Sequence, residues 1–145
     1  MLGIGSLVVG AWALAAPMSF HESFPGFGHS WVAPEGPFNE HLLRDVGGLN
    51  LGFAAVAFLA VASMTLPLVR AAAVAHLLFG VPHLLFHATH VGHFATGDAV
   101  AIVGSLAVPV VAAVTVLVLS RRPAAATVDR LSGADTSVTT GGRCV

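Results

Sequence analysis

The sequence predicts an all-α fold, a four-transmembrane-helix bundle, and three observations lead to this prediction. The composition is 56% hydrophobic and only 9% charged, with a mean hydropathy of +0.87, whereas a soluble domain normally has about 25% charged residues. Four apolar runs follow one another along the chain, and each is long enough to cross a hydrocarbon core of about 30 Å. The charged residues lie between these runs or at their ends. We therefore expect residues 1–122 to form one membrane domain.

The four predicted spans cover residues 2–20, 46–69, 71–91 and 99–119. The first contains no charge over about eighteen residues, which is just enough to cross the core. Only Arg70 separates the second span from the third, so this pair should form a tight hairpin with Pro67 near its turn. Pro82 interrupts the third span and should kink it, because proline lacks the amide hydrogen that the helix needs.

Arginine placement predicts the orientation of these spans. Arg70, Arg121 and Arg122 fall on one side of a four-span chain, whereas the loop between the first two spans is mainly acidic. The positive-inside rule then places the hairpin and both termini in the cytoplasm of a multi-pass cell-membrane protein. Residues 1–15 also resemble a signal peptide without a basic start, so their cleavage stays open. Residues 123–145 are rich in Ala, Thr, Ser and Gly, and we expect a disordered cytoplasmic tail.

The loop between the first two spans, on the extracytoplasmic side, is rich in aromatic residues, glycine and proline. From Phe24 to Phe38 turn-forming residues alternate with Phe and Trp side chains. Turn formers at this density predict a compact cap rather than a linker, and the rings are expected to rest at the membrane interface. Whether the cap also covers a polar site as a lid is left open by the sequence.

Five of the eight histidines fall within one 18-residue stretch of the third span, and they are the most informative feature of the chain: His76, His83, His87, His90 and His93. At 100° per residue the first four share one helix face, and His93 lies beside it. Titratable side chains at membrane depth are costly and usually face a bundle interior or a water-filled cavity. A buried core role for His76 and an interfacial position for His93 are the simpler interpretations of those two.

The predicted topology brings this histidine face toward the outer end of the second span, where polar residues also share a face. Imidazole nitrogen and carboxylate oxygen together suit Zn(II), Fe(II) or Cu(II). The sequence therefore predicts an outward-facing transition metal site. Its candidate ligands are His83, His87, His90, His41, Asp45 and Glu40. Gly48 and Gly52 on the same side of the second span predict a close approach to another helix.

Other functions stay open at this stage. Haem is a weaker candidate than a metal ion, because the other spans offer no second axial histidine. A proton or ion path could use the same histidine face, and a non-catalytic accessory subunit or homo-oligomer would need only smooth helices and the aromatic loop. No nucleophile is aligned with a base, so the sequence does not decide whether the protein is an enzyme. The scattered arginines argue against nucleic acid as a partner.

Three strings resemble a group of small multi-span membrane proteins of actinobacteria. They are SFHESFPGFGHSWV at residues 19–32, GPFNEHLLRDVG at 36–47 and VPHLLFHATH at 81–90. The resemblance covers residues 1 to about 120. The group has no assigned activity, so the resemblance implies a four-helix membrane protein and supplies no mechanism.

Overall fold

The computed structural model describes residues 1–121, which are almost entirely helical and confirm the predicted all-α class. The long helices are α1 (Leu2–Ala15), α3 (Glu40–Ser63), α4 (Leu66–His90) and α5 (Thr96–Ser120). The segment between α1 and α3 contains α2 (Pro17–Ser23), the paired strands β1 (Pro25–Gly26) and β2 (His29–Ser30), and the 3-10 turn η1 (Ala33–Glu35). A second 3-10 turn, η2 (Val91–His93), joins α4 to α5. The predicted tail at 123–145 lies outside the described residues.

Three of the helices, α3, α4 and α5, are long and apolar enough to cross a membrane. The predicted first span, residues 2–20, is not one straight helix, because α1 and α2 meet at an angle of 117°. The break falls at Ala16, whose φ of −140° and ψ of 65° are not helical, since a following proline disfavours the helical backbone. At 1.5 Å per residue α1 rises only about 21 Å. A fourth span therefore exists only if the bent pair is counted as one.

The turn between the second and third spans comes earlier than predicted. Helix α3 begins at Glu40 rather than residue 46, because the Asn39 side chain caps it by accepting a hydrogen bond from the Leu42 amide at 3.1 Å. It ends where Met64 adopts a left-handed φ of 50°. Helix α4 then begins with Pro67 in its first turn, where proline is tolerated. Arg70 consequently lies inside α4 and not at the turn.

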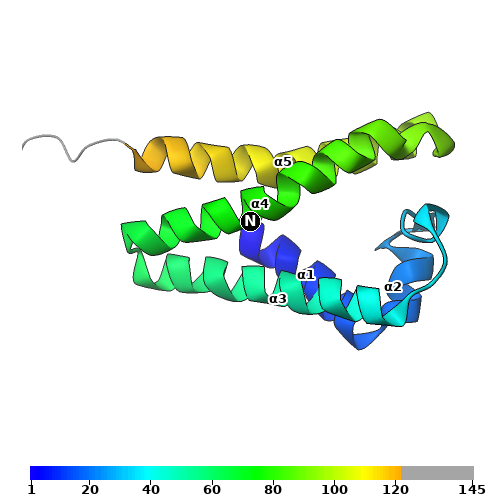
Figure 1. The fold of residues 1–145 in the computed structure, drawn as a ribbon, viewed down its shortest axis with the longest axis horizontal. Helices are drawn as coiled ribbons and strands as arrows, with labels where there is room; N and C mark the ends of the chain where they lie inside the picture. The colour runs from blue at the N-terminus through cyan, green and yellow to red at the C-terminus, as the bar shows by residue number, and fades with distance from the viewer. Residues whose placement is uncertain (122–145) are drawn as a thin grey trace, which may run out of the picture.

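The long helices form two pairs that diverge from one end of the molecule to the other. Helix α1 packs along α3, and α4 packs along α5. Figure 1 shows α3 and α4 close together at their turn and apart at the opposite end, where α2 and the segment that follows lie between them. We call residues 17–39 the cap, and the end of the molecule that they occupy the cap end. The cap thus fills the wedge between the two helix pairs.

Close packing of α1 on α3 depends on two glycines. A Cβ atom added to Gly10 would lie 2.8 Å from the Leu51 amide nitrogen, and one added to Gly47 would lie 2.7 Å from that of Leu14. Glycine allows the two backbones to meet here. The predicted close approach at Gly48 and Gly52 was wrong, because an added Cβ at either position has no neighbour within 4 Å. The glycine of α3 that meets another helix is Gly47.

Two arginines hold the ends of neighbouring helices. Arg44 Nη1 donates a 2.6 Å hydrogen bond to the Leu14 carbonyl at the end of α1. Arg70 Nη2 donates a 2.6 Å hydrogen bond to the Ser120 carbonyl at the end of α5. Both acceptors belong to the last turn of a helix, where carbonyl groups lack an intrahelical partner. The contact also places Arg70 and Arg121 at the same end of the molecule, away from the cap.

Candidate functional site

The histidine face of α4 is only partly a cluster. His83 and His87 are in direct contact, with ring centroids 4.7 Å apart. His76 is separate and only 8% exposed; its Nδ1 donates to the Ala72 carbonyl at 2.8 Å and its Nε2 lies 3.4 Å from the Ser6 hydroxyl. Both nitrogens of His76 therefore have partners, as expected of a satisfied core histidine.

Two phenylalanine rings separate His76 from the histidines above it. The Phe53 ring lies 5.2 Å from that of His76 and 5.6 Å from that of Phe79, and Phe79 stacks on His83 at 5.1 Å. A benzene ring neither donates nor accepts a transferable proton. Within the described residues, the imidazoles of α4 therefore do not form an unbroken relay from the cap end to His76.

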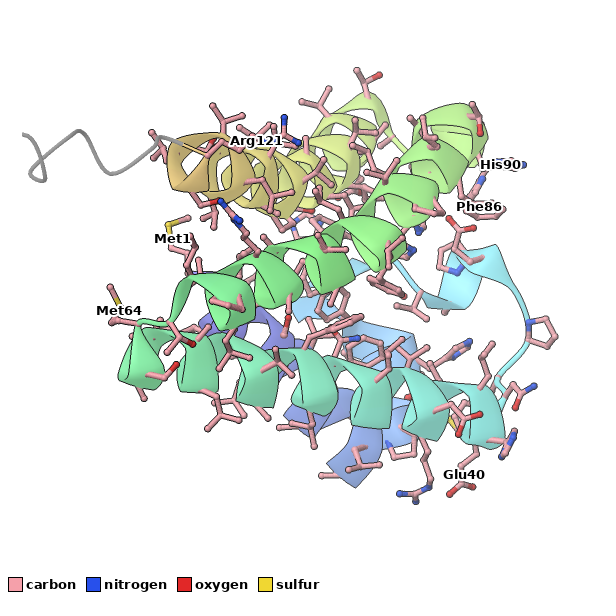
Figure 2. All side chains as sticks on the ribbon, turned by 60° about the vertical axis from the view of Figure 1, so that its left-hand side comes forward. Met1, Glu40, Met64, Phe86, His90 and Arg121 are labelled. Atoms are coloured by element: carbon pink, nitrogen blue, oxygen red, sulfur yellow. The ribbon has the colours of Figure 1, made fainter. Side chains whose placement is uncertain are left out.

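His90 does not join His83 and His87. Its ring stacks on that of Phe86, with centroids 4.2 Å apart and planes 10° apart, and its Nδ1 donates to the Phe86 carbonyl at 2.8 Å. Figure 2 shows the two side chains together at the cap end of α4. Because the ring is exposed and held by its own helix, His90 has the contacts of a surface residue.

The three predicted ligands on α3 lie apart from the α4 histidines. His41 Nε2 is 3.2 Å from Asp45 Oδ2, and these side chains are 89% and 64% exposed. Glu40 Oε1 accepts from Arg44 at 2.7 Å. Figure 2 shows Glu40 and His90 at separate helix ends, and in Figure 1 the cap lies between those ends. The divergence of α3 from α4 is the physical reason why His41, Asp45 and Glu40 do not meet His83, His87 and His90.

The carboxylate next to the α4 histidines comes from the cap, whereas the sequence predicted that it comes from α3. Glu35 Oε1 lies 3.5 Å from His87 Nδ1 and 3.7 Å from His93 Nε2. Both separations exceed the 2.7–3.2 Å of an N–H···O hydrogen bond. His87 Nδ1 is shielded from solvent and has no hydrogen-bond partner within the described part of the chain. A shielded, unpaired nitrogen that faces a carboxylate is unusual in a folded protein.

Local backbone geometry brings these three side chains together. Glu35 ends the η1 turn, which is closed by a 3.0 Å hydrogen bond from its amide to the Val32 carbonyl. His93 ends the η2 turn, which has three residues per turn instead of 3.6. The helical period therefore no longer applies to His93, which is why the sequence placed it beside the histidine face. Glu35 belongs to the acidic loop that the sequence placed at the same face as these histidines, but no periodic pattern singled it out as their partner.

A second carboxylate ties the cap to α5. Asp98 Oδ1 lies 2.7 Å from His29 Nδ1 and accepts a 3.0 Å hydrogen bond from Trp31 Nε1. Asp98 lies in the first turn of α5, where the helix dipole favours a negative charge. Two carboxylates thus join the cap to the region where α4 meets α5. Glu35 of the cap contacts histidines of α4 and η2, and Asp98 of α5 contacts His29 and Trp31 of the cap.

Most of the cap aromatics are packed inside the protein. Phe20 forms a small core with Ala13 and Leu43, and the side chains around it are Val9, Trp12, Phe24, Val32 and Phe38. The Phe20 and Phe24 rings lie 4.6 Å apart. The expected interfacial belt is therefore largely a core between α1, α2 and α3. Phe27 is the exception, because it is 100% exposed.

As placed, residues 1–121 contain no group of three or more His, Cys, Asp or Glu side chains that could hold a metal ion. What they do contain is one oxygen, Glu35 Oε1, flanked by two imidazole nitrogens. Models of known protein families give no match to the chain, and neither do curated proteins or solved structures. The chemistry of the site must therefore be argued from its geometry alone.

Proposed function

We propose that this protein is a multi-span membrane protein that binds a transition metal ion at its cap end, with Glu35, His87 and His93 as ligands. The observation that supports the proposal most directly is the shielded Nδ1 of His87, which has no hydrogen-bond partner and faces Glu35 Oε1 at 3.5 Å. His93 Nε2 lies 3.7 Å from the same oxygen. Two imidazole nitrogens thus lie within 4 Å of one carboxylate oxygen, and zinc binds both donor types.

The separations are longer than a hydrogen bond and compatible with a shared metal ion. Zinc binds histidine nitrogen at about 2.0–2.1 Å and carboxylate oxygen at about 2.0–2.2 Å in tetrahedral geometry, so a nitrogen and an oxygen on one ion stand about 3.4 Å apart. The two nitrogen-to-oxygen distances of 3.5 and 3.7 Å are near this value. Small side-chain rotations would be needed to bring all three donors onto one point, since they do not converge as placed.

His83 and the coordination number bear on the identity of the metal. Three protein ligands leave a fourth position for water or substrate, as in catalytic zinc sites. The His83 ring contacts that of His87 at a centroid distance of 4.7 Å, which makes His83 a candidate fourth donor. Two imidazoles and one carboxylate also form the donor set of non-haem Fe(II) sites, and imidazole suits Cu(II). Zinc, iron and copper are therefore the ions to test, with zinc first.

We further propose that the cap faces the extracytoplasmic side of the cell membrane. Arg70 and Arg121 lie at the opposite end of the molecule, and the positive-inside rule assigns that end to the cytoplasm. The C-terminal end of α5 is then cytoplasmic. The N-terminus lies on the same side only if α1 and α2 together cross the membrane, and Figure 1 shows it partway along the bundle.

The decisive experiment measures metal per protein by elemental analysis, and zinc affinity by competition with a chelator, on the full chain in detergent. Glu35→Gln keeps the size of the side chain and removes the anionic ligand, so affinity should fall by a factor of about 10 or more. His87→Ala should do the same. His90→Ala and His41→Ala are matched controls, because both imidazoles have partners elsewhere.

Two outcomes would refute the site. If Glu35→Gln and His87→Ala retain the metal content of the wild type, Glu35 and His87 are not ligands. If His41→Ala and His90→Ala lower affinity and Glu35→Gln does not, the ligand set is the one that the sequence predicted. Wild-type protein without metal that co-purifies with a larger membrane complex would instead favour an accessory subunit.

A further inference from the structure

The tip of the cap hairpin exposes a large apolar side chain in an unfavourable backbone conformation. Phe27 is 100% exposed and has a φ of 58°, between Gly26 at 97° and Gly28 at 83°. A positive φ is uncommon for residues other than glycine, and Asn or Asp are the usual exceptions. Neither packing within the described chain nor turn propensity therefore favours phenylalanine here. A backbone outlier of this kind at an exposed ring points to a functional contact outside the chain.

The hairpin is held firmly beside the start of α5. Strand pairing joins Pro25 to Ser30, and the Trp31 amide donates to the Phe24 carbonyl at 2.8 Å. Next to the tip, Asp98 in the first turn of α5 binds both His29 and Trp31. Helix α5 is long and apolar enough to span a membrane from Thr96. An α5 that spans the membrane would begin near the lipid headgroups, and Asp98 would then hold the hairpin close to that level.

The neighbouring sequence would allow this tip to enter a lipid layer at low cost. Residues 23–34 contain no Asp, Glu, Lys or Arg, and the flanking charges are Glu22 and Glu35. Glu35 is turned toward the α4 histidines. A charged loop would have to be desolvated on insertion, whereas an aromatic ring between two glycines gains from leaving water.

We infer that Phe27 is a membrane anchor: its ring inserts into the headgroup layer of the leaflet on the cap side and pins the cap to the bilayer. Of the loop aromatics, Phe27 alone takes this role, because the other rings pack within the cap or bind Asp98. The inference is independent of metal binding at Glu35. It requires only that α5 spans the membrane.

Site-directed spin labelling of the full chain in phosphatidylcholine vesicles tests the inference. In a Cys144→Ser background, single cysteines at Phe27→Cys, Glu22→Cys and Val108→Cys would each carry one nitroxide. Glu22 is an exposed cap residue and the matched aqueous control; Val108, exposed on the surface of α5, is the lipid reference. The readout is nitroxide accessibility to oxygen, which concentrates in lipid, and to a nickel chelate, which stays in water.

The nitroxide at position 27 should respond to oxygen more than to the chelate, with a ratio several-fold above that at position 22 and below that at position 108. Equal access of the chelate to positions 27 and 22 would show that the tip lies in water and overturn the inference. Shielding of position 27 from both reagents would place a protein over it, which also overturns the inference. Unchanged Trp31 emission in each variant verifies that the cap remains folded.

Discussion

Replacing Gly47 by alanine tests the close contact between α1 and α3 most directly. The added Cβ would lie 2.7 Å from the Leu14 amide nitrogen, 2.9 Å from its Cβ and 3.0 Å from its Cα. Two of these atoms belong to the backbone, so the strain cannot be relieved by rotating a side chain. The helices must move apart, and the Arg44 contact with the Leu14 carbonyl must lengthen with them.

The magnitude follows from two opposing terms. Overpacking at a tight contact costs about 1–3 kcal/mol, while alanine gains about 0.5–1 kcal/mol over glycine within a helix. We therefore expect Gly47→Ala to lower the free energy of unfolding by about 1–2 kcal/mol. Gly48→Ala is the matched control, because an added Cβ there meets nothing within 4 Å. It should leave stability unchanged or raise it by up to about 1 kcal/mol.

The assay is unfolding of the purified protein in detergent by increasing sodium dodecyl sulfate, monitored by tryptophan fluorescence. Trp12 is a suitable reporter, since it lies on α1 two residues before Leu14 and packs on Phe20 and Phe24. The two variants should separate clearly, with Gly47→Ala unfolding first. If Gly47→Ala is as stable as Gly48→Ala, the backbones of α1 and α3 do not meet at this position and the helix pairing described above is wrong.

Three further predictions concern the cap, the core and the orientation. Asp98→Asn should loosen the cap, because it weakens the contacts with His29 and Trp31; acrylamide should then quench Trp31 more strongly, whereas Asp45→Asn on the exposed face of α3 should change nothing. His76→Ala should lower the free energy of unfolding by about 1–3 kcal/mol without changing bound metal, since it removes a buried ring and leaves polar partners unsatisfied. If the variant is as stable as the wild type, water must already reach these polar groups. A cysteine at position 33 should react with an impermeant reagent only from outside intact cells, and a reporter fused after residue 122 should be active only in the cytoplasm; labelling of position 33 from the cytoplasmic side alone would reverse the proposed orientation.

Composition and charge spacing were enough to predict the helical class and three helices long and apolar enough to cross a membrane. They missed the bend at Ala16, because an uncharged run of eighteen residues satisfies a length criterion whether or not it is straight. Pro17 was the signal in the sequence that could have indicated the bend. The first residue of α3 was also missed, since Asp45 was taken as the boundary before the second span. A polar first turn capped by Asn39 can extend a helix beyond its apolar part.

Side-chain partners were harder to predict than helices. Helical periodicity correctly brought His83 next to His87, because contacts one turn apart are local. It failed for Glu35, which reaches α4 from a 3-10 turn in a loop, and for Asp98, whose partner His29 is far away in sequence. Such contacts depend on how the loop folds in space, and no spacing within one element contains that information.

The length of the cap determines how far apart the two helix pairs lie at the cap end. Since α3 and α4 are joined at one end and held apart by residues 17–39 at the other, the cap acts as a spacer that sets the distance between their far ends. A shorter segment would let the far ends of the two helices approach each other, and it would move Glu35 relative to His87 and His93. The contact between the cap and the α4 histidines thus depends on the length of a loop on which none of those histidines lies.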